Sequence, residues 1–475
     1  MRQSSKHIVI VIATTIVVLL VLSYVPWSSI TENRIKDFGI FSDLFPKESN
    51  INVKSNIEID PELTKFIAEN QQEIDKLLNA TTETSDSLVC AKGDSINSAP
   101  KNEPVINASI DVDSVQIENY TSDDEMFPHL KKALSQRENR LVRIAMIGDS
   151  FIEGDILCQD FRDTLQIRYG GCGVGYMAMH SDFPGFRKTV RQSDSGWTMH
   201  DVHNMKSNDT IRVLSGDYAK GSQGSRTTYK GSSFSTRTSS WQRSSFIFIA
   251  HNDGTINFTT SDGTVHSFNV TASYEPQYIK LDSATTSLNI SSDIADLISL
   301  GAYLDGQNGV QLDCMSLRGA SGVSHGKLNV DLCRRMAEFV DYDLIIVEFG
   351  INALTAEQTD YTPYMYAMIQ AVTHIKKCYP EADILILGIS DRGFKDGVEI
   401  KSMPTCDAMV KAQRELARRS GVYFWDTRAA MGGAGAIVDW RKRKLMNADY
   451  IHLNHKGGHE MAKLLSTSLF QALDE

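Results

Sequence analysis

The feature that most constrains the fold is a repeated alternation of short apolar runs with amphipathic helical stretches. The apolar runs lie at 142–147, 343–349, 383–389 and 422–425, and helical periodicity covers 155–169, 325–339, 361–378, 405–420 and 456–473. Continuous apolar runs are typical of strands that are buried on both faces of a sheet. Strands that alternate with helices usually pair in parallel. The pattern therefore predicts a three-layer α/β/α domain with a mainly parallel sheet.

A region of different character interrupts this alternation. Between residues 186 and 312, short strand-like segments are separated by Asn252-Asp253-Gly254 and Ser261-Asp262-Gly263, which are strong hairpin signals. Several short strands at such spacing are typical of a β-sandwich or jelly roll. Because the α/β pattern resumes afterwards, we expect an inserted domain between two parts of the α/β domain, at 136–185 and 313–475.

The amino terminus indicates a compartment. Ile8–Val25 is almost unbroken apolar sequence, Arg2 and Lys6 precede it, and the next charge is Glu32. Such a run is just long enough to cross a bilayer, and its positive flank places the N-terminus in the cytoplasm. We expect 1–27 to hold a cytoplasmic stub and the transmembrane anchor of a single-pass membrane protein, with the rest periplasmic. A cleaved signal peptide is the alternative, although a clean A-x-A site is missing.

Residues 28–135 carry little that would bury a core. Apolar residues at helical spacing predict a helix over 61–78. The stretch 79–124 is rich in Thr, Ser, Asn, Asp and Glu, which is typical of a flexible tether. We therefore expect a stalk that is partly helical and largely disordered.

Charge and cysteine usage exclude two classes of protein. The net charge of −11 argues against a nucleic-acid-binding protein, which needs a basic face. The seven cysteines contain no C-x-x-C pair, which excludes the usual zinc spacings and gives no clear disulfide framework. We expect neither a metal nor a cofactor, and the sequence does not indicate a protein partner.

Ser150 is the candidate nucleophile. It follows the apolar run 142–147 and precedes a helical stretch, and α/β folds place their chemistry at the ends of such strands. A serine needs a base, and the base needs a group that holds its tautomer. Asp449 and His452 form a D-x-x-H turn before the last helix, which places a carboxylate within reach of the imidazole. A satisfied structural histidine is the alternative interpretation of His452.

Three groups form a candidate oxyanion hole. They are the backbone N–H of Ser150, the backbone N–H of Gly319 and the side-chain amide of Asn352, which follows the run 343–349. Donors of this kind are worth roughly 3–4 kcal/mol each in acyl transfer. Gly322 competes with Gly319 for the same role.

Four blocks in this order resemble the SGNH/GDSL hydrolase superfamily. They are G-D-S-F at 148–151, R-G-A-S-G at 318–322, G-I-N at 350–352 and D-Y-I-H at 449–452, and Ala353 stands where the family usually has Asp. The resemblance implies an SGNH-type, flavodoxin-like fold. It implies Ser150, Asp449 and His452 as catalytic residues, and Ser150, Gly319 and Asn352 as the oxyanion hole.

The stretch Met431–Gly435, together with Trp440, is similar to one branch of that superfamily. The branch contains membrane-anchored or periplasmic bacterial peptidoglycan O-acetylesterases that carry an inserted carbohydrate-binding β-domain. The resemblance implies an extracytoplasmic serine esterase that removes O-acetyl groups from peptidoglycan or another polysaccharide.

Three alternatives remain open. An O-acetyltransferase would use the same triad on a cell-envelope glycan, and a lipid or thioester hydrolase would be distinguished by how its rate depends on acyl chain length. The third is a tethered glycan-binding protein that stacks sugars on aromatic side chains of the insert, namely Trp197, Trp241, Tyr274 and Tyr278.

Overall fold

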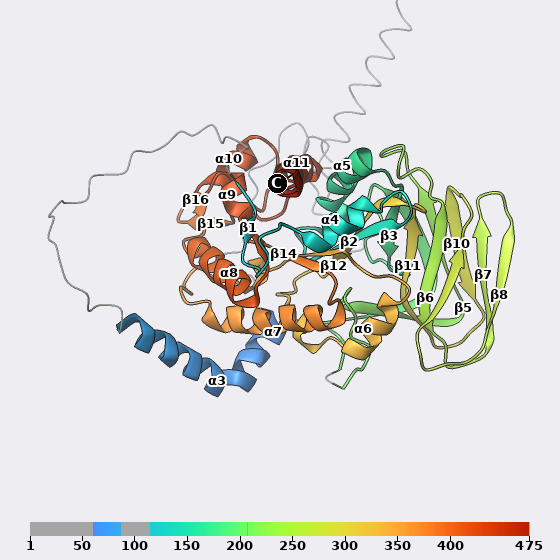
Figure 1. Cartoon of the computed structure of the whole chain (residues 1–475), viewed down its shortest axis with the longest axis horizontal. Coiled ribbons are helices and arrows are strands. Elements are labelled where there is room, and N and C mark those ends of the chain that lie inside the picture. The colour runs from blue at the N-terminus through green and yellow to red at the C-terminus, as the bar shows by residue number, and fades with distance from the viewer. Residues whose placement is uncertain (1–59, 87–114, 207, 475) are drawn as a thin grey trace, which may run out of the picture. The chain divides into compact units, whose positions relative to one another are not determined.

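The computed structural model describes residues 60–86, 115–206 and 208–474 (Figure 1). The predicted anchor at 1–27 and much of the predicted stalk lie outside these described residues. Within them, no helix is both long enough and apolar enough to span a bilayer.

The predicted parallel sheet is confirmed. Its parallel strands are β2 (Leu141–Gly148), β12 (Gly309–Ser316), β13 (Leu344–Glu348), β14 (Asp383–Leu387) and β17 (Tyr423–Trp425). Their order is β12-β2-β13-β14-β17, and the short strand β1 (Glu118–Asn119) pairs antiparallel to β17 at one edge. In chain order of the parallel strands this is 2-1-3-4-5, the flavodoxin-like arrangement, whose switch point lies between β2 and β13. Ligands bind outside the carboxyl ends of the strands at such a point.

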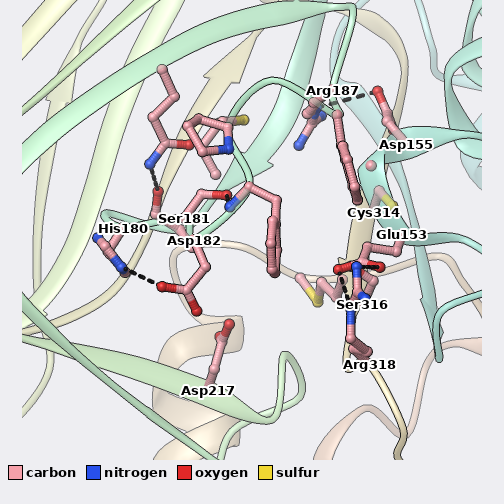
Figure 2. Close-up of a pocket in the computed structure, with 18 of the residues that line it drawn as sticks. Glu153, Asp155, His180, Ser181, Asp182, Arg187, Asp217, Cys314, Ser316 and Arg318 are labelled. Carbon is pink, nitrogen blue, oxygen red and sulfur yellow. Dashed lines mark hydrogen bonds and ion pairs between the residues drawn. The ribbon is translucent and has the colours of Figure 1, made fainter. Parts of the chain in front are cut away.

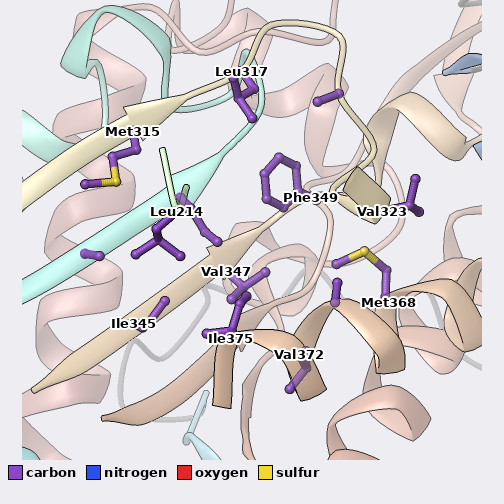
Figure 3. Close-up of a cluster of buried hydrophobic side chains, with 14 of the residues drawn as sticks. Leu214, Met315, Leu317, Val323, Ile345, Val347, Phe349, Met368, Val372 and Ile375 are labelled. Carbon is purple, nitrogen blue, oxygen red and sulfur yellow. The ribbon is translucent and has the colours of Figure 1, made fainter. Parts of the chain in front are cut away.

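Helices cover both faces of this sheet, because alternate strand residues point to opposite sides. Ile345 and Val347 of β13 pack with Met368, Val372 and Ile375 of one helix in a single buried cluster (Figure 3). The helices on that face are α6 (Val330–Ala337), α7 (Thr362–Cys378) and α8 (Cys406–Ser420). The opposite face packs against α4 (Pro128–Ser135), α5 (Cys158–Tyr169), α9 (Thr427–Met431), α10 (Ala436–Lys442) and α11 (His455–Asp474).

Where a sandwich was predicted, the structure has one nine-stranded antiparallel sheet. Its strands are β3 (Gly173–Met177), β4 (Val190–Asp201), β5 (Asp217–Gly231), β6 (Arg243–Ile249), β7 (Gly254–Thr260), β8 (Val265–Val270), β9 (Gln277–Leu281), β10 (Ser287–Ser292) and β11 (Leu297–Asp305). The long strand β5 pairs with β11 through its first half and with β10 through its second half. Phe246 of β6 and Phe258 of β7, from the two halves, share one buried cluster. The sheet therefore folds over on itself around a core of its own.

The predicted boundaries of this β-domain were wrong at both ends. The antiparallel sheet begins with β3, before residue 186, and β12 belongs to the parallel sheet although the predicted boundary at 312 cuts through it. Gln311 and Asp313 give β12 the alternation of a half-buried strand, yet both side chains are fully buried. They are buried because a cation from β2 and neighbouring polar groups satisfy them.

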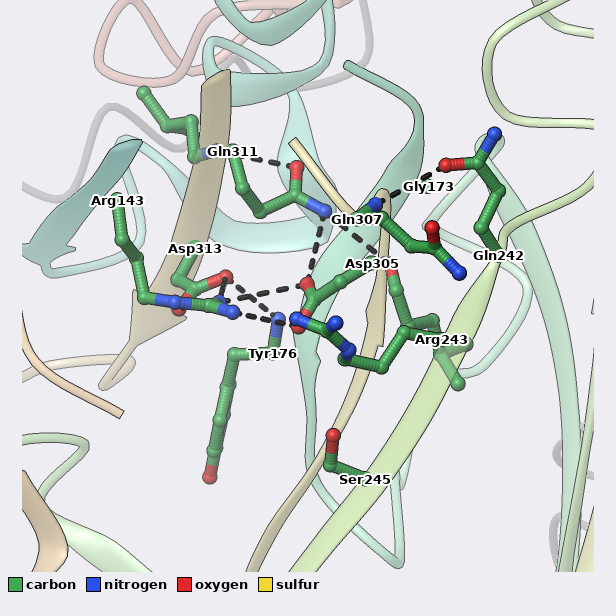
Figure 4. A network of polar contacts seen from close by, with 12 residues as sticks. Arg143, Gly173, Tyr176, Gln242, Arg243, Ser245, Asp305, Gln307, Gln311 and Asp313 are labelled. Carbon is green, nitrogen blue, oxygen red and sulfur yellow. Dashed lines mark hydrogen bonds and ion pairs between the residues drawn. The ribbon is translucent and has the colours of Figure 1, made fainter. Parts of the chain in front are cut away.

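That cation is Arg143, which joins the two sheets (Figure 4). Its guanidinium binds Asp305 of β11 at 2.5 Å and Asp313 of β12 at 2.9 Å. Asp313 also accepts the backbone N–H of Tyr176 at 2.9 Å, so β3 is tied to the same centre. Burial alone would lower the pKa of Arg143, but the two facing carboxylates raise it well above its usual value.

The end of the predicted stalk is part of the α/β domain, so the prediction for that portion of 28–135 was wrong. Ile117, Phe127 and Leu130 are buried against the sheet. The N–H of Leu130 donates to Asp383 at 2.9 Å, which holds the first turn of α4.

The predicted stalk helix is present as α3 (Pro61–Asp86), and its start packs on the α/β domain. Leu63 and Ile74 are buried, and the Phe66 ring lies 6.1 Å from that of Tyr366 on α7. The first turn of this helix therefore does not stand free of the domain.

Candidate active site

Ser150 lies at the carboxyl end of β2, beside the switch point. A side chain at Gly148 would come within 2.7 Å of the Glu348 carbonyl and carboxylate, so only glycine fits where β2 meets β13. The Asp149 N–H donates to the Glu348 carbonyl at 3.2 Å, and the Leu317 N–H donates to the Gly148 carbonyl at 2.8 Å. These bonds hold the loops after β12 and β13 against the start of the Ser150 turn.

The structure brings the three predicted catalytic side chains into one hydrogen-bonded chain. Ser150 Oγ lies 2.8 Å from His452 Nε2, and His452 Nδ1 lies 2.8 Å from Asp449 Oδ2. Tyr450, between the acid and the base, takes a positive φ of 58°, which closes the turn so that both side chains face each other. Ser150 and His452 come together across 302 positions of sequence.

Asp449 determines which imidazole nitrogen carries the proton. Its Oδ1 accepts the backbone N–H groups of Ile451 and His452 at 3.0 and 3.1 Å. Burial opposes its ionisation, but these bonds and the His452 ring lower the pKa of Asp449 below its usual value. An ionised carboxylate only accepts hydrogen bonds, so His452 Nδ1 must donate to it. Nε2 is then free to accept the Ser150 proton.

Asp149 does not contact the histidine and instead stabilises the loops. Its carboxylate accepts the Phe151 N–H and Asn352 Nδ2, each at 2.9 Å. Burial raises the pKa of Asp149 to about 7, although these hydrogen bonds oppose the shift. Burial, together with the adjacent Asp149, likewise raises the pKa of Glu348 well above its usual value.

The three predicted oxyanion donors differ in how they are placed. Asn352 Nδ2 donates to Asp149 at 2.9 Å and to the Ala320 carbonyl at 3.0 Å, so both amide hydrogens are engaged. Donation to an oxyanion would require the loss of one of these bonds. Gly322 is buried against the Phe349 ring, whereas Gly319 is partly exposed with a φ of +77°. The exposure therefore favours Gly319 over Gly322 as the glycine that meets a ligand.

Two residues that sequence reasoning missed, His203 and Glu153, hold Arg318 and the peptide before Gly319. The Arg318 carbonyl lies 2.8 Å from His203 Nε2, and the Arg318 guanidinium binds Glu153 with Nη2 2.6 Å from Oε2. The carbonyl and the Gly319 N–H belong to one peptide group, so the His203 bond sets the direction of that N–H. No motif marks His203, because it comes from a loop of the β-domain.

A cavity of about 360 Å³ lies next to these loops, between the β-domain and the α/β domain (Figure 2). Glu153 and Arg318 line it, and Ser150 is not among its lining residues. Figure 2 shows the carboxylates of Asp182 and Asp217 pointing into the same space. The cavity therefore lies beside the loop that follows Ser150, and Ser150 itself does not line it.

The aromatic residues proposed to stack sugars do not form a platform. Trp197 and Trp241 are buried in the core of the β-domain, and Tyr278 stacks on Phe339 at 5.1 Å. Tyr274 is 83% exposed and lies beside His251. The stacking interpretation is wrong for the two tryptophans, because Trp197 of β4 and Trp241, in an isolated bridge before β6, both fill the core.

Among the described residues, one group of three potential metal ligands lies close together: Asp155, Cys158 and Cys314. Both oxygens of Asp155 already accept from Arg162 at 2.8 Å. Burial raises the pKa of the Cys158 thiol well above its usual value, so the thiolate that a metal would need is disfavoured. These residues do not fit a metal ion.

Comparisons with known proteins identify a related family and similar solved structures. Residues 295–459 match the model of the GDSL-like Lipase/Acylhydrolase family. The search of curated proteins found no match. A solved peptidoglycan O-acetylesterase is similar, with 22% identity and a TM-score of 0.63, over 75% of this chain and 99% of that chain. A family two carbohydrate esterase from Cellvibrio japonicus aligns at 12% identity over 60% of this chain and 98% of its own, with a TM-score of 0.26.

The matched residues contain Gly319, Asn352, Asp449 and His452, whereas Ser150 precedes them on the far side of the β-domain. The likeness to the peptidoglycan O-acetylesterase shows a shared fold. The resemblance to SGNH/GDSL hydrolases, drawn from four short blocks of sequence, is confirmed. Residues 295–459 thus belong to the GDSL-like lipase/acylhydrolase family, and the chain is an SGNH/GDSL-type carboxylic ester hydrolase.

Proposed function

We propose that this protein is an extracytoplasmic serine esterase that removes O-acetyl groups from peptidoglycan or another polysaccharide. The observation that carries the proposal is the hydrogen-bonded chain from Asp449 through His452 to Ser150, with 2.8 Å at each step. A shared fold with a peptidoglycan O-acetylesterase over 75% of the chain supports the choice of ester. Extracytoplasmic placement rests on the apolar segment Ile8–Val25 and its basic flank.

The proposed mechanism begins at the Ser150 hydroxyl. His452 Nε2 takes the hydroxyl proton as Oγ attacks the acetyl carbonyl carbon, and Asp449 stabilises the imidazolium that forms. The N–H groups of Ser150 and Gly319 donate to the oxyanion of the tetrahedral intermediate. Collapse breaks the bond to the sugar oxygen, which takes the proton from His452. Water, deprotonated by the same imidazole, then releases acetate from the acyl-serine.

Free acetate released from O-acetylated peptidoglycan tests this function. The full chain is expected to release it, and Ser150→Ala is expected to lose at least about 10³-fold in kcat while it stays folded. Ser135→Ala, an exposed serine on α4, is the matched control. Retained activity in Ser150→Ala would refute the assignment of the nucleophile.

Two further measurements separate this function from its alternatives. Transfer of acetyl groups from a donor ester to a deacetylated glycan, in place of release into water, would identify an O-acetyltransferase. A rate that rises with acyl chain length from C2 to C8 would identify a lipid or thioester hydrolase. An optimum at C2 fits the acetylesterase.

A further inference from the structure

We infer that the cavity between the β-domain and the Ser150 loop is a subsite for an uncharged sugar unit, next to the unit that carries the ester. This inference rests on the proposed function for the ester bond, but its chemistry is argued from the cavity itself. The volume of about 360 Å³ lies within the roughly 300–1,000 Å³ range of pockets that hold small ligands. Its position at a domain junction is also typical of such sites.

Phe183 and Phe186 supply an exposed apolar wall. Their rings stack at 5.4 Å, and they remain 50% and 48% exposed. The Arg318 guanidinium lies 4.9 Å from the Phe183 ring centre, which fixes the pair from the side of the Gly319 loop. Sugar rings stack on such surfaces because their C–H faces are apolar. The wall therefore fits a pyranose ring better than an extended acyl chain, which would need a closed apolar tunnel.

This wall is joined directly to the nucleophile loop. A side chain at Gly154 would come within 2.9 Å of Phe186 Cβ, so the backbone four residues after Ser150 packs against the phenylalanine. Glu153, one residue earlier, holds Arg318. The wall therefore lies beside the loop that carries Ser150.

The opposite side of the cavity offers hydrogen-bond acceptors. Asp217 is partly buried and accepts the Tyr176 hydroxyl at 2.9 Å, and Asp182 lies 3.1 Å from His180. Figure 2 shows both carboxylates directed at the cavity. Hydroxyl groups of a sugar donate to such carboxylates.

The charges of the residues that line the cavity disfavour an anionic ligand. The cavity lining contains two arginines, and each is already paired, Arg187 with Asp155 at 3.3 Å and Arg318 with Glu153. Asp182 shares His180 with Asp194, and Asp201 and Asp217 also line the cavity, so carboxylates outnumber cations there and a phosphate or carboxylate would be repelled. An uncharged hexose or N-acetylhexosamine satisfies both the aromatic wall and the acceptors.

Kinetics of Phe183→Ala test the subsite. The variant is expected to lose about tenfold more kcat/KM on an O-acetylated tetrasaccharide than on methyl acetate, which has no ring that could stack on the wall. The control is Val265→Ala, an exposed apolar residue of the β-domain that does not line the cavity, and it should match the wild type on both esters. Equal losses on the two esters in Phe183→Ala would overturn the inference.

Direct binding separates this inference from the proposed function. Titration of the Ser150→Ala protein with an N-acetylglucosamine tetrasaccharide needs no ester, and its calorimetric Kd should rise about tenfold when Phe183→Ala is added. Absence of binding, or tighter binding of octanoate or glycerol phosphate, would overturn the subsite even if acetate release is observed. Binding without acetate release would leave the subsite standing and refute the proposed function alone.

Discussion

Replacement of Asp449 by asparagine tests the proposed catalytic roles, because the structure determines how the new amide must lie. Asp449 Oδ1 accepts two backbone N–H groups, from Ile451 and His452, while Oδ2 faces His452 Nδ1. An asparagine carbonyl keeps both backbone bonds only if its NH₂ group faces the ring. The amide then donates to Nδ1, so the ring proton sits on Nε2. His452 can no longer accept the proton of Ser150.

A wrong tautomer of this kind lowers kcat about 10⁴-fold in a well-buried serine protease triad. The Asp449 side chain is 36% exposed, so solvent screens part of its effect. We expect Asp449→Asn to lose between about 10² and 10⁴ in kcat, or about 2.7–5.4 kcal/mol of transition-state stabilisation. Hydrolysis of 4-nitrophenyl acetate measures the loss, circular dichroism checks the fold, and Asp439→Asn on α10 is the exposed control. A loss below tenfold in a folded Asp449→Asn protein would refute the tautomer argument.

Three further changes have expected outcomes. Arg143→Met leaves two buried carboxylates without their cation and should lower the free energy of unfolding in urea by about 3–5 kcal/mol. Arg140→Met, at a partly exposed ion pair, should lower it by less than about 1 kcal/mol. Equal losses would contradict the stabilising role of the buried Arg143 ion pairs. Burial raises the pKa of Asp383 to about 6, so its contribution to stability is greatest below about pH 4 and is lost as the pH rises to 6. Asp383→Asn should remove this fall from a plot of melting temperature against pH. The same pH dependence in the variant and the wild type would contradict the argument. His203→Phe should lower kcat about tenfold with little change in KM, because the bond from His203 to the Arg318 carbonyl directs the Gly319 N–H. His203→Gln should keep part of that kcat. An unchanged kcat in His203→Phe would contradict this role.

The parallel sheet and the pairing of Asp449 with His452 were predictable because both depend on local pattern. A continuous apolar run such as 343–349 admits few structures other than a buried strand, and the run before Ser150 has the same form. A short D-x-x-H turn brings Asp449 and His452 together without help from distant residues. This turn lies between α10 and α11 and not at the end of a strand, so its approach to Ser150 needs the packing of the whole domain.

The missed elements depend on partners that are distant in the sequence. Phe127 and Leu130 stand in a polar region, and their burial requires the Tyr423 hydroxyl and the Asp383 carboxylate, which come more than 250 positions later. Periodicity alone would assign Asp313 of β12 to solvent, because its partner Arg143 lies 170 positions earlier. A periodicity argument assigns a polar residue to solvent, and only a specific ion pair reverses that assignment.

The loop that carries Gly319 also depends on partners distant in the sequence, because four separate segments hold it. Asn352 binds the Ala320 carbonyl, the Gly148 carbonyl accepts the Leu317 N–H, and His203 binds the Arg318 carbonyl. Asp60, buried at the start of α3, accepts both the N–H and the hydroxyl of Ser321, at 2.8 and 2.6 Å. Oxyanion donors are effective when they are oriented before charge develops, since no reorganisation is then needed. The stalk helix and the β-domain therefore contribute to the geometry of a loop that the sequence marks only with two glycines.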